Sequence, residues 1–396
     1  MPAPYPAPPP RSAGRPVIDL PEPDAEAKAR CAQVLELLRR DIEEAGGWIS
    51  FARYMDRVLY APGLGYYTGG ARKFGPAGDF VTAPELSPLF GRSLASTARA
   101  VLDQSGGDIL ELGAGSGRLA ADLLLELERH GALPEHYRIL ELSGELRQRQ
   151  AETLAEAAPH LLPRVTWLDT LPERIRGLVL GNEVLDAVPP HVLHWTESGL
   201  MERGVAWSAG PVWAERPASP ELAAQAAVLP VEGDYVSEVN PAATALVASL
   251  AERLEAGALL FIDYGYPMAE YYHPQRCTGT LMAHYRHRSL DDPFFLPGLA
   301  DLTAHVDFSA VARAGEEAGL DLLGYTSQAH FLTDAGLLDL MLETTPMSPE
   351  YLRAAVAVQR LLQPSEMGEL FKVIGLGRGV EEGLPGFRRG DRRGAL

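Results

Sequence analysis

A glycine-rich loop between an apolar strand and a helix constrains the fold of this chain more than any other feature. The apolar run 109–112 leads directly into Gly113, Gly115 and Gly117, and a helical pattern of leucines begins after Arg118. Glycines at such a joint permit a tight turn and allow a ligand to lie against bare backbone near the helix N-terminus. The sequence therefore predicts an α/β fold with a ligand site at this loop.

The same order of strand, loop and amphipathic helix recurs along the chain. Apolar runs that predict buried strands lie at residues 108–112, 137–140, 165–168, 178–180 and 258–262. Strand patterns near 321–326 and 370–376 follow a helical pattern near 308–319. Alternation of this kind is typical of a parallel sheet that helices cover on both faces. We expect a doubly wound sheet of seven strands.

The chain divides into a sheet domain and several additions. Short alternating apolar segments after residue 190 predict an inserted β-meander, followed by a helix near 241–255. Asp24 and Ser50 are the predicted caps of two N-terminal helices. The predicted segments are a disordered proline-rich tail at 1–22, a helical segment covering the active site at 23–104, the sheet domain at 105–190 and 256–377, an inserted substrate or interaction subdomain at 191–255, and a flexible basic tail at 378–396.

Composition argues against several classes of function. The 396 residues include 53 acidic and 35 basic side chains, a formal net charge of −18, which disfavours electrostatic binding to nucleic acid or to an anionic membrane. No stretch approaches the roughly 20 apolar residues that span a bilayer. Cys31 and Cys277 give no disulfide framework, so we expect a cytoplasmic protein. The spacing of His273, His284 and His287 with Cys277 matches no zinc site, and we expect no metal.

The spacing within the glycine loop distinguishes between two classes of cofactor. A dinucleotide fingerprint has Gly or Ala one position after Gly117, where this chain has Arg118. The G-x-G-x-G form, preceded by the acid Glu111, instead resembles motif I of the class I S-adenosylmethionine methyltransferases. In those folds the acid often faces the methionine amino group. The alternative is an ordinary glycine turn.

Acids at the ends of the next two strands extend this interpretation. Glu141 is placed to accept hydrogen bonds from both hydroxyls of a ribose, unless it is a solvated carboxylate at a strand end. Asp169 is a candidate partner for an adenine amino group, with a turn or a helix cap as the alternative. The predicted cofactor-binding residues are Glu111, Gly113, Ala114, Gly115, Gly117, Glu141, Leu142, Asp169 and Asn182.

Polar residues also follow the fourth and fifth strands. Asn182, Glu183 and Asp186 follow the fourth strand, and Asp263 follows the fifth. Ligands of open α/β sheets bind at this edge, and carboxylates there can hold two nitrogens of an arginine guanidinium and turn the third toward a methyl donor. We predict Glu183 and Asp263 as this clamp, with Asp186 beside them and Asn182 nearer the cofactor. The alternative is that Glu183 caps the next helix and Asp186 shapes a loop.

Further motifs make the resemblance specific to one family. Residues 78–85, 181–189 and 263–266, with the stretches 49–67 and 301–311, resemble the MidA-like family. The resemblance implies a class I methyltransferase fold, which is Rossmann-like, and S-adenosyl-L-methionine as the donor. It also implies a protein arginine as the acceptor, because the family includes a mitochondrial complex I assembly factor that methylates arginine on a complex I subunit.

The resemblance also indicates residues on the substrate side. Asp79, Thr82 and Glu85 match the family's N-terminal motif, and Tyr264 is either a substrate-facing wall or core packing. Three other functions stay open: a non-catalytic assembly chaperone, a methyltransferase of a small molecule, and a dinucleotide oxidoreductase. The expected partner is a protein substrate, and a homodimer is a further expectation.

Overall fold

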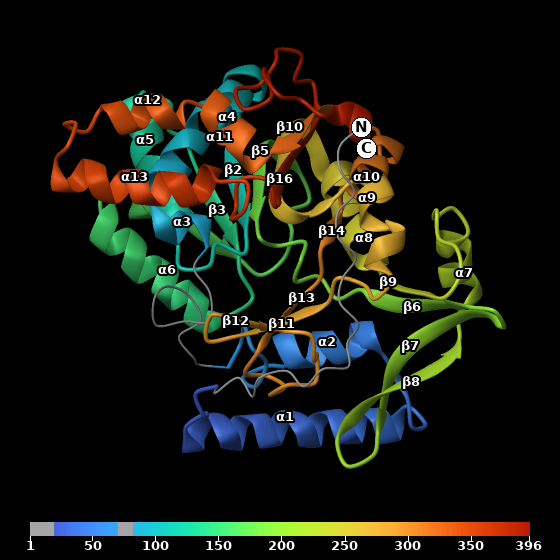
Figure 1. Cartoon of the computed structure of the whole chain (residues 1–396). Coiled ribbons are helices and arrows are strands. Elements are labelled where there is room, and N and C mark those ends of the chain that lie inside the picture. The colour runs from blue at the N-terminus through green and yellow to red at the C-terminus, as the bar shows by residue number, and fades with distance from the viewer. Residues whose placement is uncertain (1–19, 70–81) are drawn as a thin grey trace.

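The order of strands in the central sheet defines the architecture. The computed structural model describes residues 20–69 and 82–396, so the predictions for residues 1–19 and for Asp79 lie outside the described residues (Figure 1). The seven predicted strands pair in the order β15-β16-β10-β5-β2-β3-β4. Their bounds are β2 Asp108–Leu112, β3 Tyr137–Leu140, β4 Val165–Leu168, β5 Ile175–Asn182, β10 Leu254–Tyr266, β15 Asp321–Ser327 and β16 Phe371–Arg378. A short strand, β14 (Val306–Asp307), pairs with the end of β10.

One strand departs from the parallel sheet that the alternation predicts. Strands β10, β5, β2, β3 and β4 are parallel, whereas β16 is antiparallel to both β10 and β15. The prediction of a wholly parallel sheet is therefore wrong at the last strand. The helices between β15 and β16 do not return the chain to the opposite edge of the sheet. Strand β16 therefore starts at the carboxyl edge, where Phe371 pairs with Tyr264.

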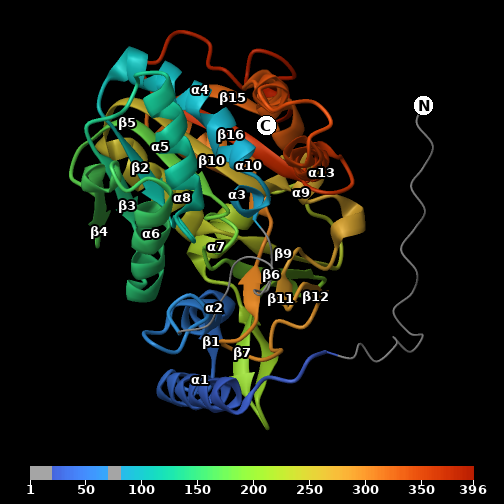
Figure 2. The same cartoon turned by 90° about the vertical axis from the view of Figure 1, so that its left-hand side faces the viewer.

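Helices cover both faces of this sheet (Figure 2). Along β10, Ala258, Leu260 and Ile262 belong to one apolar cluster and Leu259 and Phe261 to the other, as the alternation of side chains along a strand requires. The first face is covered by α4 (Pro88–Ser105), α5 (Arg118–Arg129), α6 (Gly144–Ala157), α11 (Gln328–Asp334), α12 (Leu337–Leu342) and α13 (Pro349–Leu362). The second face is covered by α8 (Pro241–Arg253) and α10 (Phe308–Glu317). Helix α8, which the sequence analysis groups with the insertion, thus packs on the sheet.

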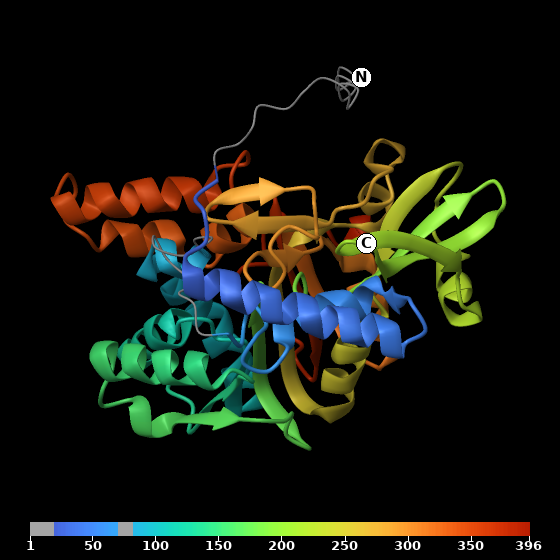
Figure 3. The same ribbon diagram turned by 90° about the horizontal axis from the view of Figure 1, so that it is seen from below.

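Three segments that are far apart in sequence form one subdomain beside the carboxyl edge of the sheet (Figures 1 and 3). Strand β1 pairs with β7 in a five-stranded sheet, and a single apolar cluster joins the first two helices to β6, β7, β11 and β13. The elements are α1 Ala25–Glu44, β1 Ile49–Ser50, α2 Phe51–Tyr60, β6 His191–Thr196, β7 Gly199–Trp207, β8 Pro211–Pro217, β9 Tyr235–Val239, β11 Met282–Tyr285, β12 Arg288–Leu290 and β13 Asp301–Thr303. Shorter helices are α3 Ala83–Leu86, α7 Pro220–Ala226 and α9 Met268–Tyr271.

Local signals at the N-terminal helices are confirmed. Asp24 caps α1 by accepting a hydrogen bond from the backbone of Ala27, and Ser50 caps α2 by accepting one from Arg53. In the described part of the chain, no helix has both the length and the apolar character needed to cross a bilayer.

The C-terminal segment differs from the flexible tail that its arginines and glycines suggest. The ring of Phe387 packs against Phe331 at 5.2 Å and is buried. Gly324 and Gly375 leave room for it, since a Cβ at Gly324 would lie 2.3 Å from the Phe387 ring. The backbone of Arg392 also donates a hydrogen bond to a strand β15 carbonyl. Apolar residues within the basic segment thus hold it against the sheet.

Candidate active site

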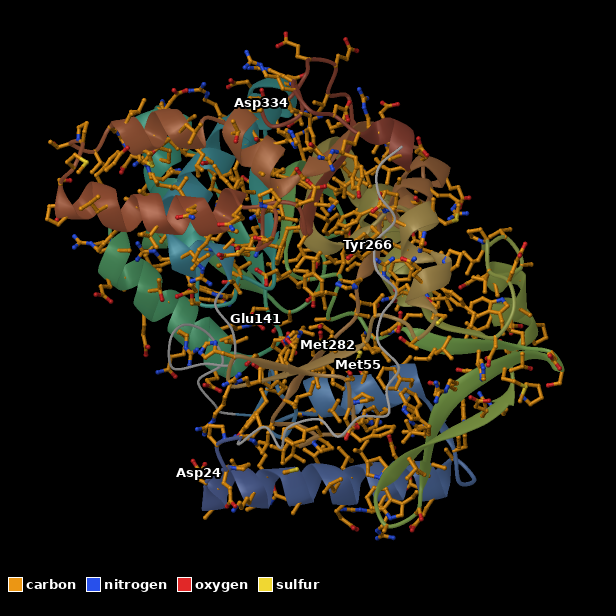
Figure 4. The ribbon with its side chains drawn as sticks, in the orientation of Figure 1. Asp24, Met55, Glu141, Tyr266, Met282 and Asp334 are labelled. Atoms are coloured by element: carbon orange, nitrogen blue, oxygen red, sulfur yellow. The ribbon has the colours of Figure 1, made fainter. Side chains whose placement is uncertain are left out.

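A cavity of about 700 Å³ lies at the carboxyl edge of the parallel strands. Its walls come from the loops after β2, β3, β5 and β10 and, on the other side, from α2 and the β11–β13 sheet. Glu141 and Met282, labelled in Figure 4, line it from these two sides. Within residues 20–69 and 82–396, no group of three His, Cys, Asp or Glu side chains is placed to hold a metal ion.

The glycine loop has the backbone conformation that requires glycine. Gly113, Gly115 and Gly117 have φ values of 58°, 52° and 83°, all in the left-handed region. A Cβ at Gly117 would lie 2.9 Å from the Cα of Gln150. Ala114 is buried in the same loop, and the cavity is lined by Gly113, Ala114 and Gly115 but not by Gly117. The last glycine therefore allows close packing against α6, and its predicted contact with the cofactor stays a prediction.

Gln150 connects the glycine loop to the second strand. Its Nε2 donates hydrogen bonds to the carbonyl of Gly115 at 3.1 Å and to Glu141 at 3.0 Å, and its Oε1 accepts one from Trp167. The sequence analysis missed this residue. A signal was present, because Gln150 lies between Leu146 and Leu154 on the buried face of α6.

Two predicted cofactor carboxylates face the cavity. Glu111 is buried and accepts a 2.7 Å hydrogen bond from the hydroxyl of Tyr137, and burial raises its pKa to about 7. Glu141 accepts hydrogen bonds from the backbone of Ser143 and from Gln150, and burial raises its pKa as well. Both are buried acids with no ion pair to a described residue, so an ammonium group and ribose hydroxyls would give them partners.

The third predicted acid lies elsewhere. The Asp169 side chain is 85% exposed, forms a 2.6 Å ion pair with Arg147 and is not part of the cavity wall. Leu142, in contrast, lines the cavity while being 73% exposed. An exposed leucine at a cavity mouth is suited to pack against a flat ring such as adenine. The structure therefore brings together every predicted cofactor residue except Gly117 and Asp169.

The loop after β5 has an unusual backbone. Glu183 has a φ of 54°, which is left-handed and costs a residue with a side chain about 1–2 kcal/mol. Its N–H still donates to the carbonyl of Ile262 on β10 at 2.8 Å. Beyond Glu183 the chain turns, and the next three N–H groups, those of residues 184–186, converge on one oxygen of Asp263.

This geometry contradicts the predicted clamp of Glu183 and Asp263. Oδ2 of Asp263 accepts from the three N–H groups of residues 184–186 at 2.9–3.3 Å, and Oδ1 accepts from the N–H of Tyr264 at 2.9 Å. Asp263 is 1% exposed and does not line the cavity. Its carboxylate is therefore occupied by backbone and is unable to reach an acceptor.

Glu183 and Asp186 do face the cavity together, with Asn182 beside them. Burial and the neighbouring Asp186 raise the pKa of Glu183 to about 8, and burial raises the pKa of Asp186 to about 6. Oδ1 of Asp186 and Oδ1 of Asn182 are buried without a hydrogen-bond partner among the described residues. Unpaired acceptor atoms beside two acids favour a cationic ligand that brings several N–H donors.

Aromatic residues form the opposite wall. Tyr60 and Tyr67 stack at 5.5 Å and both line the cavity. The Tyr60 hydroxyl donates to the carbonyl of Ala187, and the Tyr67 hydroxyl donates to Asp301. Tyr264, predicted as a wall or as core, lines the cavity and packs edge-on against Phe371. The sequence analysis missed Tyr60, Tyr67 and Asp301, although all three lie in motifs that carry the family resemblance.

The N-terminal motif lies near the cofactor loop. Thr82 and Glu85 line the cavity, and the Glu85 carboxylate accepts a hydrogen bond from the hydroxyl of Ser116. Helix α3 is thereby tied to the glycine loop. The prediction that Thr82 and Glu85 bind substrate stays a prediction.

Comparison with known sequences gives matches over most of the chain. A family model described as "Putative S-adenosyl-L-methionine-dependent methyltransferase" matches residues 89–326. The mitochondrial protein arginine methyltransferase NDUFAF7 homologue of Drosophila melanogaster is 32% identical over 403 residues, which cover 92% of this chain and 89% of that protein. The mitochondrial protein arginine methyltransferase NDUFAF7 of Homo sapiens is 29% identical over 365 residues, which cover 83% of this chain and 80% of that protein.

Two solved structures from Burkholderia thailandensis are also similar over the whole length. One was determined bound to S-adenosyl-homocysteine; it has a TM-score of 0.93 and 53% identity, and covers 96% of this chain and 100% of that chain. The other, a native crystal structure, has a TM-score of 0.90 and 52% identity with the same coverage.

Proposed function

This chain belongs to the MidA-like family of S-adenosylmethionine-dependent methyltransferases, and we propose that it methylates an arginine side chain of a protein substrate. The predicted class I methyltransferase fold and the S-adenosylmethionine cofactor are confirmed by the family match and by the similar crystal structure with S-adenosyl-homocysteine. Arginine as the acceptor is supported by the names of relatives that are 29% and 32% identical.

The observation that carries this proposal is the pair of acids without a counterion. Glu183 and Asp186 line the cavity, and neither forms an ion pair with a lysine, arginine or histidine that the structure describes. A buried and a half-buried carboxylate that repel each other favour a ligand with delocalised positive charge. A guanidinium supplies five N–H donors in a planar fork, which matches two carboxylates and the unpaired Oδ1 of Asp186.

The residues of the two sides would divide the work of methyl transfer. Glu111 and Glu141 would hold the amino group and ribose of S-adenosylmethionine, whose sulfonium supplies the methyl group for an in-line displacement. Glu183 and Asp186 orient the guanidinium so that one nitrogen faces the donor. The stacked rings of Tyr60 and Tyr67 exclude water from this side.

A proton must leave the acceptor as the new bond forms. The nitrogen gains a methyl group and loses one hydrogen, while the sulfonium becomes a neutral thioether. In the ligand-free protein Glu183 holds a proton below about pH 8, and a bound guanidinium lowers this pKa by its positive charge, so that Glu183 gives up its proton to solvent and its carboxylate then accepts the one that leaves the acceptor. The proton then passes to solvent, and the methylated guanidinium keeps its charge.

Mass spectrometry tests the proposal. The purified protein is incubated with methyl-labelled S-adenosylmethionine and protein extract from cells that lack the gene, and labelled peptides are sequenced. We expect label on methylarginine with the wild-type protein and little with Glu183→Gln. Label confined to lysine, to carboxyl groups or to small molecules would reject arginine as the acceptor.

A further inference from the structure

We propose that Asp263 is a positioning residue that holds the loop of residues 183–186 in the shape that presents Glu183 and Asp186 to the methyl acceptor. The inference concerns the site described above and rests on the proposed function only for the chemical identity of the acceptor. It assigns to Asp263 a role in methyl transfer without contact to either substrate.

The register of two neighbouring strands places Asp263 beside Glu183. Ile262 on β10 pairs with Asn182 on β5, so Asp263 and Glu183 are the next residues along each strand. From this place the carboxylate lies beneath the turn that follows β5. Its Oδ2 accepts three successive N–H groups, from Val184, Leu185 and Asp186, at 3.1, 2.9 and 3.3 Å.

Among the residues that the structure describes, the N–H groups of residues 184–186 have no other hydrogen-bond partner in the sheet. The ladder between β5 and β10 ends with the bond from the N–H of Glu183 to the carbonyl of Ile262. Buried N–H groups need an acceptor, and three of them converge on one oxygen only if the backbone curls around it. The Asp263 carboxylate thereby supplies the hydrogen-bond acceptor that a neighbouring strand would supply within the sheet.

The backbone conformation of Glu183 also indicates that the loop is held in place. Its φ of 54° is sparsely populated for a residue with a side chain, so surrounding contacts must hold it there. Without the Asp263 acceptor, the N–H groups of residues 184–186 lose their shared partner, and the backbone at Glu183 can relax to an extended or right-handed conformation. Either change would turn the Glu183 side chain away from its present direction.

The positioning role of Asp263 is separate from cofactor binding. Among the described residues, Asp263 forms no hydrogen bond with the glycine loop or with Glu141, and it does not line the cavity. Val184 is the nearest link, since its side chain lies 3.6 Å from the position of a Cβ on Gly113. Loss of the Asp263 acceptor should therefore affect transfer far more than donor binding.

The test compares two aspartates that do the same local chemistry. Asp307 is the matched control, because its carboxylate also accepts two backbone N–H groups, those of Ser309 and Ala310, but caps α10 outside the cavity wall. Asp263→Asn and Asp307→Asn are made in the full chain. Each is measured for melting temperature, for S-adenosyl-homocysteine affinity by calorimetry, and for transfer of labelled methyl groups to extract protein from cells lacking the gene.

We expect both variants to melt earlier and to keep S-adenosyl-homocysteine affinity within about threefold of the wild type. The KM for S-adenosylmethionine should also be unchanged in both. The transfer rate should fall about 100-fold in Asp263→Asn, the size of a misplaced reacting group, and less than about threefold in Asp307→Asn.

Two results would overturn the inference. One is a transfer rate in Asp263→Asn equal to that in Asp307→Asn. The other is loss of S-adenosyl-homocysteine binding in Asp263→Asn, which would mean that the carboxylate supports the whole fold. Neither result depends on which residue type carries the label, so a non-arginine acceptor would reject the proposed function and leave this comparison intact.

Discussion

The Tyr60 hydroxyl donates a 2.9 Å hydrogen bond to the backbone carbonyl of Ala187. This bond joins α2, which belongs to the subdomain beside the carboxyl edge of the sheet, to the loop that carries Glu183 and Asp186. Two side chains therefore hold the loop after β5. Asp263 accepts hydrogen bonds from its N–H groups, and Tyr60, which precedes Ala187 by 127 residues, donates to the carbonyl of that residue.

Tyr60→Phe should weaken transfer without affecting donor binding. One hydrogen bond to a backbone carbonyl is lost, at a cost of about 1 kcal/mol, and we expect the methyl-transfer rate to fall about three- to tenfold. Tyr285→Phe is the matched control, because its hydroxyl also donates to a backbone carbonyl, that of Pro21, and does not line the cavity. Equal rates in the two variants would contradict the importance of the Ala187 contact.

Glu183→Gln should separate binding of the donor from transfer. The substitution keeps the size of the side chain and removes the negative charge that Glu183 carries when the cationic acceptor is bound. The acceptor loses a charge-assisted hydrogen bond, and the departing proton loses its acceptor. We expect the rate to fall about 100-fold or more, with S-adenosyl-homocysteine affinity unchanged by calorimetry. Glu152→Gln, on the exposed face of α6, should behave as the wild type.

Donor binding should depend on Glu141 and not on Asp169. Glu141→Gln places an amide opposite the Nε2 donor of Gln150 and removes an acceptor for ribose, so we expect about tenfold weaker binding of S-adenosyl-homocysteine. Asp169→Asn removes only an exposed ion pair with Arg147, and affinity should stay within about twofold. Calorimetry of both variants checks this; a larger loss in Asp169→Asn would restore its predicted contact with adenine.

The raised pKa of Glu183 makes stability depend on pH. Between its usual value of 4.5 and about 8, the folded protein holds a proton on Glu183 that the unfolded chain releases. Folding then binds protons, so stability falls as pH rises through this range. The melting temperature of the ligand-free protein should therefore drop more between pH 6 and pH 8.5 in the wild type than in Glu183→Gln. Parallel curves for the two proteins would show that Glu183 titrates at an ordinary pKa.

The C-terminal segment should contribute to stability as part of the core. Phe387→Ala opens a cavity beside Phe331 and the glycines of β15 and β16, and we expect a loss of about 3 kcal/mol in the free energy of unfolding. Arg388→Ala changes an exposed neighbour and should cost less than about 0.5 kcal/mol. Urea unfolding measures both. Similar values would support the flexible tail that the sequence suggests.

Local patterns predicted the strands and the edge of the sheet at which the candidate cofactor residues lie. Glu111 lies at the end of β2, and the glycine loop and Glu141 directly follow strands, so their place at the carboxyl edge is set by the chain itself. The role of Asp263 was not predictable in this way. Whether its carboxylate faces the cavity or the backbone depends on the φ of Glu183, a residue 80 positions earlier.

The acceptor side was harder to predict because it is assembled from distant segments. Tyr60 and Asp301 reach the cavity through a subdomain that combines α2 with the β11–β13 sheet. Tyr54 and Met55 lie on the buried face of α2, yet the helical spacing of such residues carries no information about what the end of that helix contacts. Only the packing of the two parts of the molecule brings these residues to Glu183.

The antiparallel β16 also has a consequence for how the protein is made. Because this strand starts at the carboxyl edge, Phe371 completes a cavity wall that begins with Tyr60. A chain emerging from the ribosome therefore lacks part of this wall until Phe371 has been synthesised, more than 300 residues after Tyr60. Contacts between such distant residues slow folding, and the cavity is complete only after β16 has been synthesised.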